Sequence, residues 1–233
     1  YENRKQNLIQ YEHIPTLQYF TRTSIKVLKP NWKTTAKRIG YIPGAGDLTG
    51  NILSLAGLQV DVLKAEDMSA DKLKKYDAVL VGVRAVNTEK RMALWMHPLL
   101  EYVHSGGTLV MQYNTLQDMS TTNIGPYPFT LASQRTTEED AAVDFLLPKH
   151  KLMNYPNAIT HEDFNDWVQE RGLYYPVKYD DKYQALFSMH DTGEQPLTGS
   201  TLYAPYGKGH YIYTSLSFFR QLPAGNKGAI RLM

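Results

Sequence analysis

Polar side chains follow three apolar stretches of this chain, each where a buried strand would end. They are Arg84 and Asn87 after the third predicted strand, Gln112, Tyr113 and Asn114 at the end of the fourth, and Arg220 and Gln221 after the last. In open parallel sheets, ligands bind beyond the carboxyl ends of the strands. Amide and guanidinium groups beside aromatic rings suit neutral polyhydroxylated ligands, because planar donors match hydroxyl groups and rings cover apolar sugar faces. The pattern therefore predicts a carbohydrate-binding site formed by these seven residues.

The same residues also have a structural interpretation. Arg84 and Arg220 would tie loops to backbone carbonyls, and the 17 tyrosines would lie in the core or in an interface. No carboxylate is obvious beside either arginine in the sequence, so in the ligand interpretation both offer positive charge to an uncharged or weakly anionic sugar. The sequence leaves the two interpretations open.

Tyr113 stands where an α/β enzyme would keep its nucleophile, at the end of the apolar run 106–114 (GGTLVMQYN). A phenol has a pKa near 10 and needs an adjacent base before it attacks. The chain contains no cysteine, which excludes a thiolate nucleophile, a disulfide and a thiolate zinc site. Tyr113 is therefore expected to pack at the strand end or to contact a ligand, and no catalytic residue is predicted.

No metal or cofactor site is predicted either. The seven histidines form no HxxH, HxxxH or HExxH set. Residues 44–50 (GAGDLTG) follow the first predicted strand with the spacing GxGxxxG, which would suit a phosphate-binding loop. Asp47 would repel a diphosphate, however, so a tight strand-to-helix turn is favoured. The net charge of +2 gives no general attraction to nucleic acid or membrane, and no apolar stretch approaches the roughly 20 residues that span a bilayer.

Short strands and helices alternate along the middle of the chain, which predicts an α/β fold with a parallel sheet. Strands are expected at residues 39–43, 58–63, 78–83 and 106–114, and helices at 48–56, 70–75 and 90–104. Residues 199–204 and 210–215 predict a terminal hairpin. After Thr115 the pattern loosens, although residues 160–163 have the spacing of a capping box and predict a helix start.

The N-terminal segment differs from the rest in composition. It lacks a sustained period to about residue 35, and from His13 through Gly46 it has no acidic residue. Six residues in that stretch are basic, namely Arg22, Lys26, Lys29, Lys33, Lys37 and Arg38. A contact with an anion and a solvated linker both explain this run, and the general behaviour of charge runs favours the linker. We expect residues 1–35 to be a linker or N-terminal extension and residues 36–233 to form one domain, since 42% apolar content suffices for a full core.

Several segments resemble known proteins. Residues 38–47 (RIGYIPGAGD), 76–84 (YDAVLVGVR), 106–114, 145–156 (FLLPKHKLMNYP) and 206–219 (YGKGHYIYTSLSFF) resemble the class I glutamine amidotransferase-like fold and, within it, ThuA-like proteins. Residues 123–129 (NIGPYPF), 167–176 (WVQERGLYYP) and 217–225 (SFFRQLPAG) are similar to the amidotransferase-like domain that follows a PIG-L/LmbE-type N-acetylsugar deacetylase in large exported bacterial proteins. The resemblance implies a flavodoxin-like parallel sheet with helices on both faces and a terminal hairpin.

The same resemblance implies that amidotransferase chemistry is lost. Where the family has G-x-C-x-G, this chain has Met111, Tyr113 and Thr115, and where ThuA-like chains have Gly-His after the last strand, it has Ser217 and Phe218. The family context implies that the partner is a deacetylase domain of the same polypeptide, which would hold the metal. It also implies an exported protein, periplasmic or at the cell surface.

Three functions stay open. The leading one is a non-catalytic module that binds carbohydrate or docks the deacetylase domain. The second is a sugar-active hydrolase or isomerase that would use Arg84, Gln112, Asn114 and a carboxylate such as Glu170. The third is a purely structural interface domain. Fold alone does not choose among them.

Overall fold

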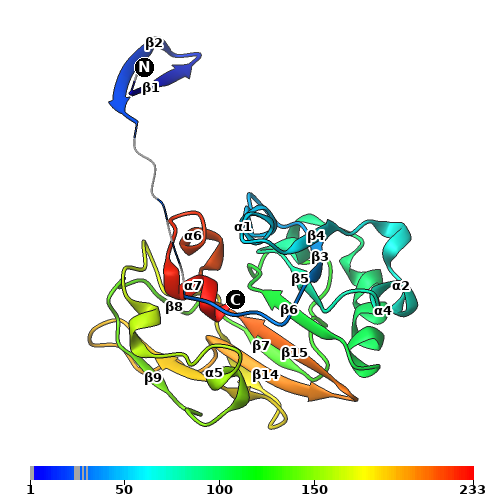
Figure 1. The fold of residues 1–233 in the computed structure, drawn as a ribbon. Coiled ribbons are helices and arrows are strands. Elements are labelled where there is room, and N and C mark those ends of the chain that lie inside the picture. Colours follow the sequence, from blue (N-terminus) through cyan, green and yellow to red (C-terminus); the bar gives the residue numbers. More distant parts are fainter. Residues whose placement is uncertain (1–2, 24–26, 28, 30) are drawn as a thin grey trace.

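The computed structural model describes residues 3–23, 27, 29 and 31–233, and a seven-stranded sheet forms its centre (Figure 1). The order across the sheet is β12-β14-β15-β6-β5-β3-β4. The strands are β3 (Arg38–Ile42), β4 (Gln59–Val62), β5 (Ala78–Val81), β6 (Thr108–Gln112), β12 (Gln184–Ala185), β14 (Thr201–Tyr206) and β15 (Gly209–Thr214). Five of them, β4-β3-β5-β6-β15, run parallel, and β14 and β12 extend the sheet antiparallel. Counted along the chain, the parallel strands have the order 2-1-3-4-5, which is that of a flavodoxin-like fold.

Helices cover both faces of this sheet. On one face α4 (Met92–His104) places Trp95, Leu99 and Val103 against the buried run of β5 and β6. The opposite face packs against α1 (Thr49–Leu55), α6 (Phe218–Gln221) and α7 (Lys227–Leu232), which bring Leu53, Phe218 and Ile230 into a second core. The predicted fold class is confirmed, including the terminal hairpin β14–β15.

The predicted strands and helices of the first half are confirmed to within a few residues at each end. Between β6 and β14 the chain forms small two-stranded sheets and short helices, in agreement with the looser pattern of this region. Its sheets are β7–β11, β8–β10 and β9–β13, built from Phe129–Leu131, Pro176–Tyr179, Arg135–Thr136, Gly172–Leu173, Val143–Phe145 and Phe187–Met189. The remaining short helices of the chain are η1 (Ala65–Asp67), α2 (Ala70–Leu73), α3 (Ala85–Thr88), α5 (Lys151–Asn154) and η2 (His161–Phe164). The predicted capping box is present at η2, because Thr160 and Asp163 each bond the other's backbone.

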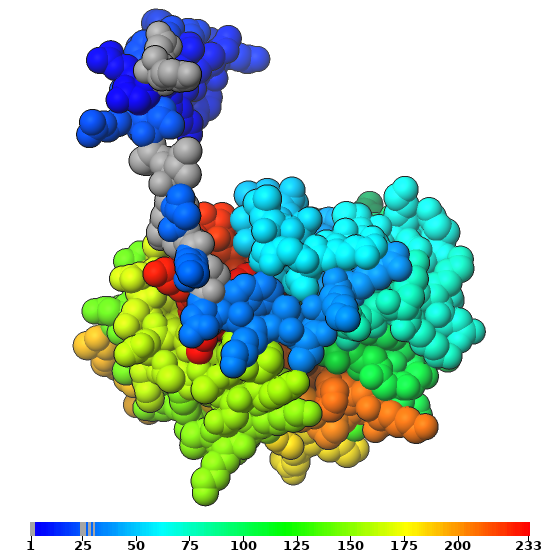
Figure 2. Space-filling model, in the orientation of Figure 1, coloured from blue at the N-terminus to red at the C-terminus, as the bar shows by residue number. Residues whose placement is uncertain are grey.

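The N-terminal segment contains a hairpin that the sequence analysis missed. Strands β1 (Arg4–Tyr11) and β2 (Ile14–Arg22) pair antiparallel, and Figures 1 and 2 show them apart from the α/β body. Nearly every residue of both strands is exposed, so neither strand has the alternation of a half-buried sheet. The exposed large apolar side chains of the hairpin are Leu8, Ile9, Tyr11, Ile14, Leu17, Tyr19 and Phe20. Lys26, from the basic run, lies outside the described residues.

Candidate functional site

The ends of β5 and β6 bring the predicted residues Arg84 and Tyr113 together. These strands are parallel neighbours, so both residues lie at the same edge of the sheet. The Arg84 N–H donates to the Tyr113 carbonyl at 2.8 Å, and the Val86 N–H donates to Asn114 Oδ1 at 3.0 Å. The expected convergence of Arg84, Gln112 and Asn114 at the carboxyl edge is confirmed.

The glycine-rich turn lies beside this edge, between β3 and β5, where the strand order reverses. A Cβ on Gly44 would lie 2.0 Å from the Val83 carbonyl oxygen, so only glycine allows the two strand ends to approach this closely. Asp47 fills the turn, because its carboxylate accepts the N–H groups of Thr49 at 2.8 Å and Val83 at 3.0 Å. The glycines therefore serve a tight turn, as predicted, and the Asp47 carboxylate occupies it by binding the amides of Thr49 and Val83.

Tyr113 lies in a group of aromatic rings that comes from three separate segments. Its ring stacks on Tyr174, with centroids 5.7 Å apart, and meets the edge of Phe219 at 5.8 Å. Tyr113 is buried, whereas Tyr174 and Phe219 are partly exposed. Burial raises the pKa of the Tyr113 phenol far above its ordinary value, with the charge of Glu170 acting in the same direction. The hydroxyl is therefore a neutral group and a poor nucleophile.

Two residues that contact Tyr113 have left-handed backbone. Arg84 has φ 59° and Tyr174 has φ 57°, a region that bulky residues rarely occupy. Such conformations cost of order 1–3 kcal/mol and persist where the surrounding structure imposes them, often at binding sites. Tyr113 itself has no positive φ, so the strain lies on its neighbours and the chain forms no strained nucleophile turn at Tyr113.

An ion pair borders the aromatic group. Arg220 Nε lies 2.5 Å from Glu170 Oε1, and the carboxylate side chain is only 10% exposed against 37% for the guanidinium. The Arg220 guanidinium also lies over the Phe219 ring, 4.7 Å from its centroid. The expectation that Arg220 has no carboxylate beside it was wrong. The expectation failed because Glu170 belongs to a different segment of the fold. Arg84, whose side chain is exposed, supplies positive charge at this edge that no ion pair between described residues balances.

The predicted amide residues are mostly engaged with backbone. Asn87 Nδ2 donates to the carbonyls of Thr115 and Gln117, and its Oδ1 accepts the Thr115 N–H. Asn114 bonds Val86 and Gln112, and Gln221 bonds both backbone groups of Val168. The exception is Gln112, which is fully buried, donates to Asp47 at 3.4 Å and has an Oε1 without a partner among the described residues. Ligand contact by these four side chains stays a prediction, and the structure gives three of them a positioning role.

We call Arg84, Tyr113, Glu170, Tyr174, Phe219 and Arg220 the Tyr113 cluster. The sequence analysis did not assign Tyr174 or Phe219 to the site, since Tyr174 follows the two-residue strand β10, which was not predicted, and Phe219 lies within the short helix α6. The segments WVQERGLYYP and SFFRQLPAG, which contain them, were the available signal. The loop after Asn114 also encloses a hollow of about 550 Å³, lined in part by Asn123, Tyr127 and Phe129.

The described residues contain neither a cluster of metal ligands nor a membrane-spanning helix. No group of three or more histidine, aspartate and glutamate side chains in this part of the chain is placed to hold a metal ion. Likewise, none of the described helices has the length and apolar character needed to cross a membrane.

Comparison with known proteins shows likeness of fold. No protein-family model matches the sequence, and no curated protein matches it. Cytoplasmic protein STM1381 from Salmonella typhimurium LT2 is similar in structure, with a TM-score of 0.51 and 13% identity over 98% of this chain and 92% of that chain. A ThuA-like protein from Bacteroides uniformis ATCC 8492 has a TM-score of 0.46 and 12% identity, over 89% of this chain and 91% of its own. A GMP synthase protein from Thermoplasma acidophilum has a TM-score of 0.46 and 10% identity, over 84% of this chain and 95% of its own. At these identities the likeness extends to the fold and not to activity.

Proposed function

We propose that this domain is a non-catalytic carbohydrate-binding module and that the Tyr113 cluster is its site. The observation that supports this most is the stacked pair Tyr113–Tyr174, because the Tyr174 ring is partly exposed and the charges of Arg84 and Arg220 act on Tyr113. Aromatic rings cover the apolar faces of sugars, and guanidinium groups donate several hydrogen bonds to hydroxyl and acetamido oxygens. The ligand we propose is an uncharged or weakly anionic sugar bound with low affinity.

The residues at the ends of the strands support a role without amidotransferase catalysis. Tyr113 stands where related folds would carry a thiol, and burial keeps its phenol protonated. Phe218, in the position of the family's histidine, is 3% exposed and packs in the second core, where it accepts no proton. Nucleophile and base are thus both replaced by residues that pack.

We further propose that the module serves an N-acetylsugar deacetylase domain of the same polypeptide, in an exported protein. The support is the resemblance of residues 123–129, 167–176 and 217–225 to domains in that arrangement. An N-acetylated sugar chain held at the Tyr113 cluster would then be kept close to the enzyme, because tethering raises the effective concentration of a substrate.

Docking of a partner domain is the second candidate, and the hairpin β1–β2 favours it. Seven large apolar side chains are exposed on this one hairpin, whereas apolar residues exposed on a protein surface are usually scattered singly. An isolated two-stranded hairpin is also only marginally stable in water, which favours its packing against a partner. In this alternative the hairpin carries the function, and the Tyr113 cluster is structural.

Titration of N-acetylglucosamine oligomers by calorimetry tests the proposal. We expect weak, saturable binding that Tyr174→Ala weakens roughly two- to ten-fold, from the 0.5–1.5 kcal/mol of an aromatic contact. Tyr19→Ala, in an exposed tyrosine of the hairpin, is the matched control and should leave the affinity unchanged. No binding of any sugar by the parent domain would favour docking. Cleavage or isomerisation of the oligomers, lost in Glu170→Gln, would instead establish the sugar-active enzyme.

A further inference from the structure

A cavity of about 260 Å³ lies on the face of the sheet opposite α4, away from the Tyr113 cluster. Leu80 of β5, Val110 of β6 and Ile212 of β15 form its floor, and Leu53 of α1 and Ile230 of α7 form walls. These are aliphatic side chains. Two threonines in the lining, Thr201 and Thr214, have their hydroxyl oxygens 3.5 Å apart and so pair with each other.

The two faces of the sheet differ in how far their side chains are buried. The difference shows that the cavity occupies space that side chains would otherwise fill. Leu109, Met111 and Tyr211, which face α4, are completely buried. Val110 and Ile212, on the opposite face of the same strands, are only partly buried. Strands of a parallel sheet are normally covered on both faces, so the centre of this sheet lacks an apolar group above β6 and β15.

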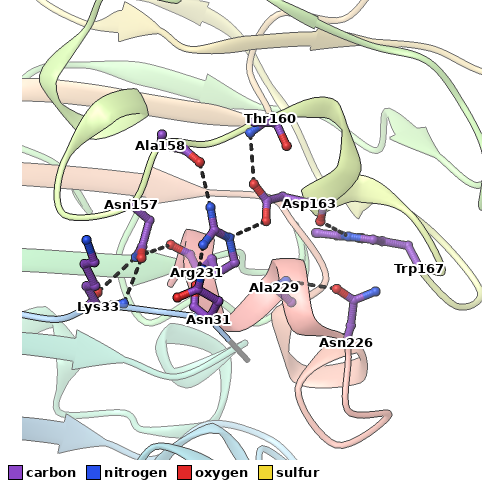
Figure 3. A network of polar contacts seen from close by, with 10 residues as sticks. All are labelled: Asn31, Lys33, Asn157, Ala158, Thr160, Asp163, Trp167, Asn226, Ala229 and Arg231. Carbon is purple, nitrogen blue, oxygen red and sulfur yellow. Dashed lines mark hydrogen bonds and ion pairs between the residues drawn. The ribbon is translucent and has the colours of Figure 1, made fainter. Parts of the chain in front are cut away.

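Residues 32–36 line the cavity, and we call the segment 31–36 the strap. In Figure 2 the blue segment that contains the strap lies across the α/β body, next to the red C-terminal residues of α7. The Asn157 side chain binds both backbone groups of Lys33 in the strap. Its Oδ1 accepts the Lys33 N–H at 2.8 Å, and its Nδ2 donates to the Lys33 carbonyl at 3.0 Å (Figure 3). Arg231 of α7 donates to the Asn31 carbonyl and forms an ion pair with Asp163 at 2.6 Å (Figure 3). These contacts attach the strap to the body of the domain at Asn31 and Lys33.

The rim of the cavity is basic. The strap belongs to the stretch between His13 and Gly46 that has no acidic residue, and Lys33 on it is exposed. A second ammonium, that of Lys151, lies 5.6 Å from the ring centroid of Tyr155, which lines the cavity. Asp163, the carboxylate of the neighbouring network, is already paired with Arg231.

We propose that this cavity binds the aliphatic chain of a single-tailed carboxylate, with the carboxylate at the Lys33 rim. A cavity lined by aliphatic side chains accepts apolar molecules. The ammonium groups at the rim complement a carboxylate head group, whereas a neutral or cationic head group gains nothing there. Of the residues of the basic run that the structure describes, Lys33 is the one that lines the cavity and would bind the carboxylate.

Titration of isotopically labelled decanoate, below its micelle concentration and followed by NMR, tests the proposal on the whole chain. We expect saturable binding of one decanoate, weaker binding of 1-decanol and no binding of butyrate, whose chain is too short to fill the cavity. Lys33→Gln should weaken decanoate binding roughly two- to five-fold, the effect of an exposed ion pair. Lys178→Gln, in an exposed lysine of β11, is the control and should change nothing.

Filling the cavity gives an independent test. Val110→Phe should abolish decanoate binding while circular dichroism shows a folded domain. If Val110→Phe does not fold, the effect of Lys33→Gln on decanoate affinity still tests the proposal. Decanoate binding that never saturates, or that persists in folded Val110→Phe, would overturn the proposal. Binding to anionic lipid vesicles without binding of free decanoate would overturn it as well, since the basic rim would then contact a membrane surface. Sugar titrations at the Tyr113 cluster are unaffected by either result.

Discussion

Tyr174 stacks on Tyr113 at an angle of 26° between the ring planes, and backbone contacts to the last parallel strand fix that geometry. Ser215, directly after β15, donates its Oγ to the Tyr174 carbonyl at 3.2 Å, and its carbonyl accepts the Leu173 N–H at 2.9 Å. Tyr174 is therefore held in its left-handed conformation by the sheet itself. A ring placed in this way before any ligand arrives loses little conformational freedom on binding, which favours binding by even a small surface.

We predict that the domain releases no ammonia from glutamine and that Tyr113→Cys alone does not create this activity. The new thiol would lack a base, because Phe218 is the residue in the required position and is buried in the second core. An ammonia assay on purified parent and variant checks both statements. Ammonia above the buffer background from either protein would contradict them.

Asn114→Ala should lower the free energy of unfolding by about 1–3 kcal/mol, because it leaves the Val86 N–H without its partner inside the protein. Urea unfolding followed by circular dichroism measures this. Gln117→Ala is the matched control: its side chain is exposed, and the substitution should change the free energy by less than about 0.5 kcal/mol. Equal effects in the two variants would show that the Asn114 amide does not hold α3.

The parallel strands could be predicted from the sequence for a physical reason. Strands buried on both faces read as unbroken apolar runs, as Ala78–Val81 and Leu109–Met111 do. The hairpin β1–β2 was missed because exposure on both faces removes any alternation of polar and apolar residues.

The candidate site was predictable only in part. Residues that follow strands directly, such as Arg84 and Tyr113, could be placed at one edge because parallel strands end together. The Glu170–Arg220 pair joins residues 50 positions apart, and no local pattern reports such a contact. Whether an amide faces solvent or binds backbone, as Asn87 does, depends on loop geometry that the sequence does not show.

Gly44→Ala should prevent stable folding or lower the free energy of unfolding by more than about 4 kcal/mol. The added Cβ would lie 2.0 Å from the Val83 carbonyl oxygen, and both atoms belong to backbone that the sheet holds. Gly57→Ala is the comparison, since its φ of +99° strains an alanine but nothing lies within 4 Å of the new Cβ. That substitution should cost only about 1–2 kcal/mol. Thermal unfolding of both variants distinguishes a steric effect from a conformational one.

The stability of the domain should fall steeply above about pH 10 because of its buried tyrosines. Burial raises the pKa of Tyr175, Tyr211 and Tyr213 far above the ordinary value of 10.0, and that of Tyr102 to about 12. A phenol whose pKa is raised in the folded state stabilises the fold fully below the unfolded value. This contribution is lost as pH rises above that value, because only the unfolded chain then releases its protons. Each such tyrosine lowers the free energy of unfolding by roughly 1.4 kcal/mol per pH unit.

Urea unfolding at several pH values from about 8 to 11, with tyrosinate absorbance recorded in parallel, measures this effect around the ordinary tyrosine pKa. Tyr213→Phe removes one ionisable group from the core. The free energy of unfolding of this variant should therefore fall less steeply with pH than that of the parent, and the difference in slope should equal the contribution of one tyrosine. Tyrosinate absorbance should rise together with loss of the fold for the buried rings. Full ionisation of all tyrosines in protein that remains folded would contradict the prediction, because the buried phenols would then have to be open to solvent.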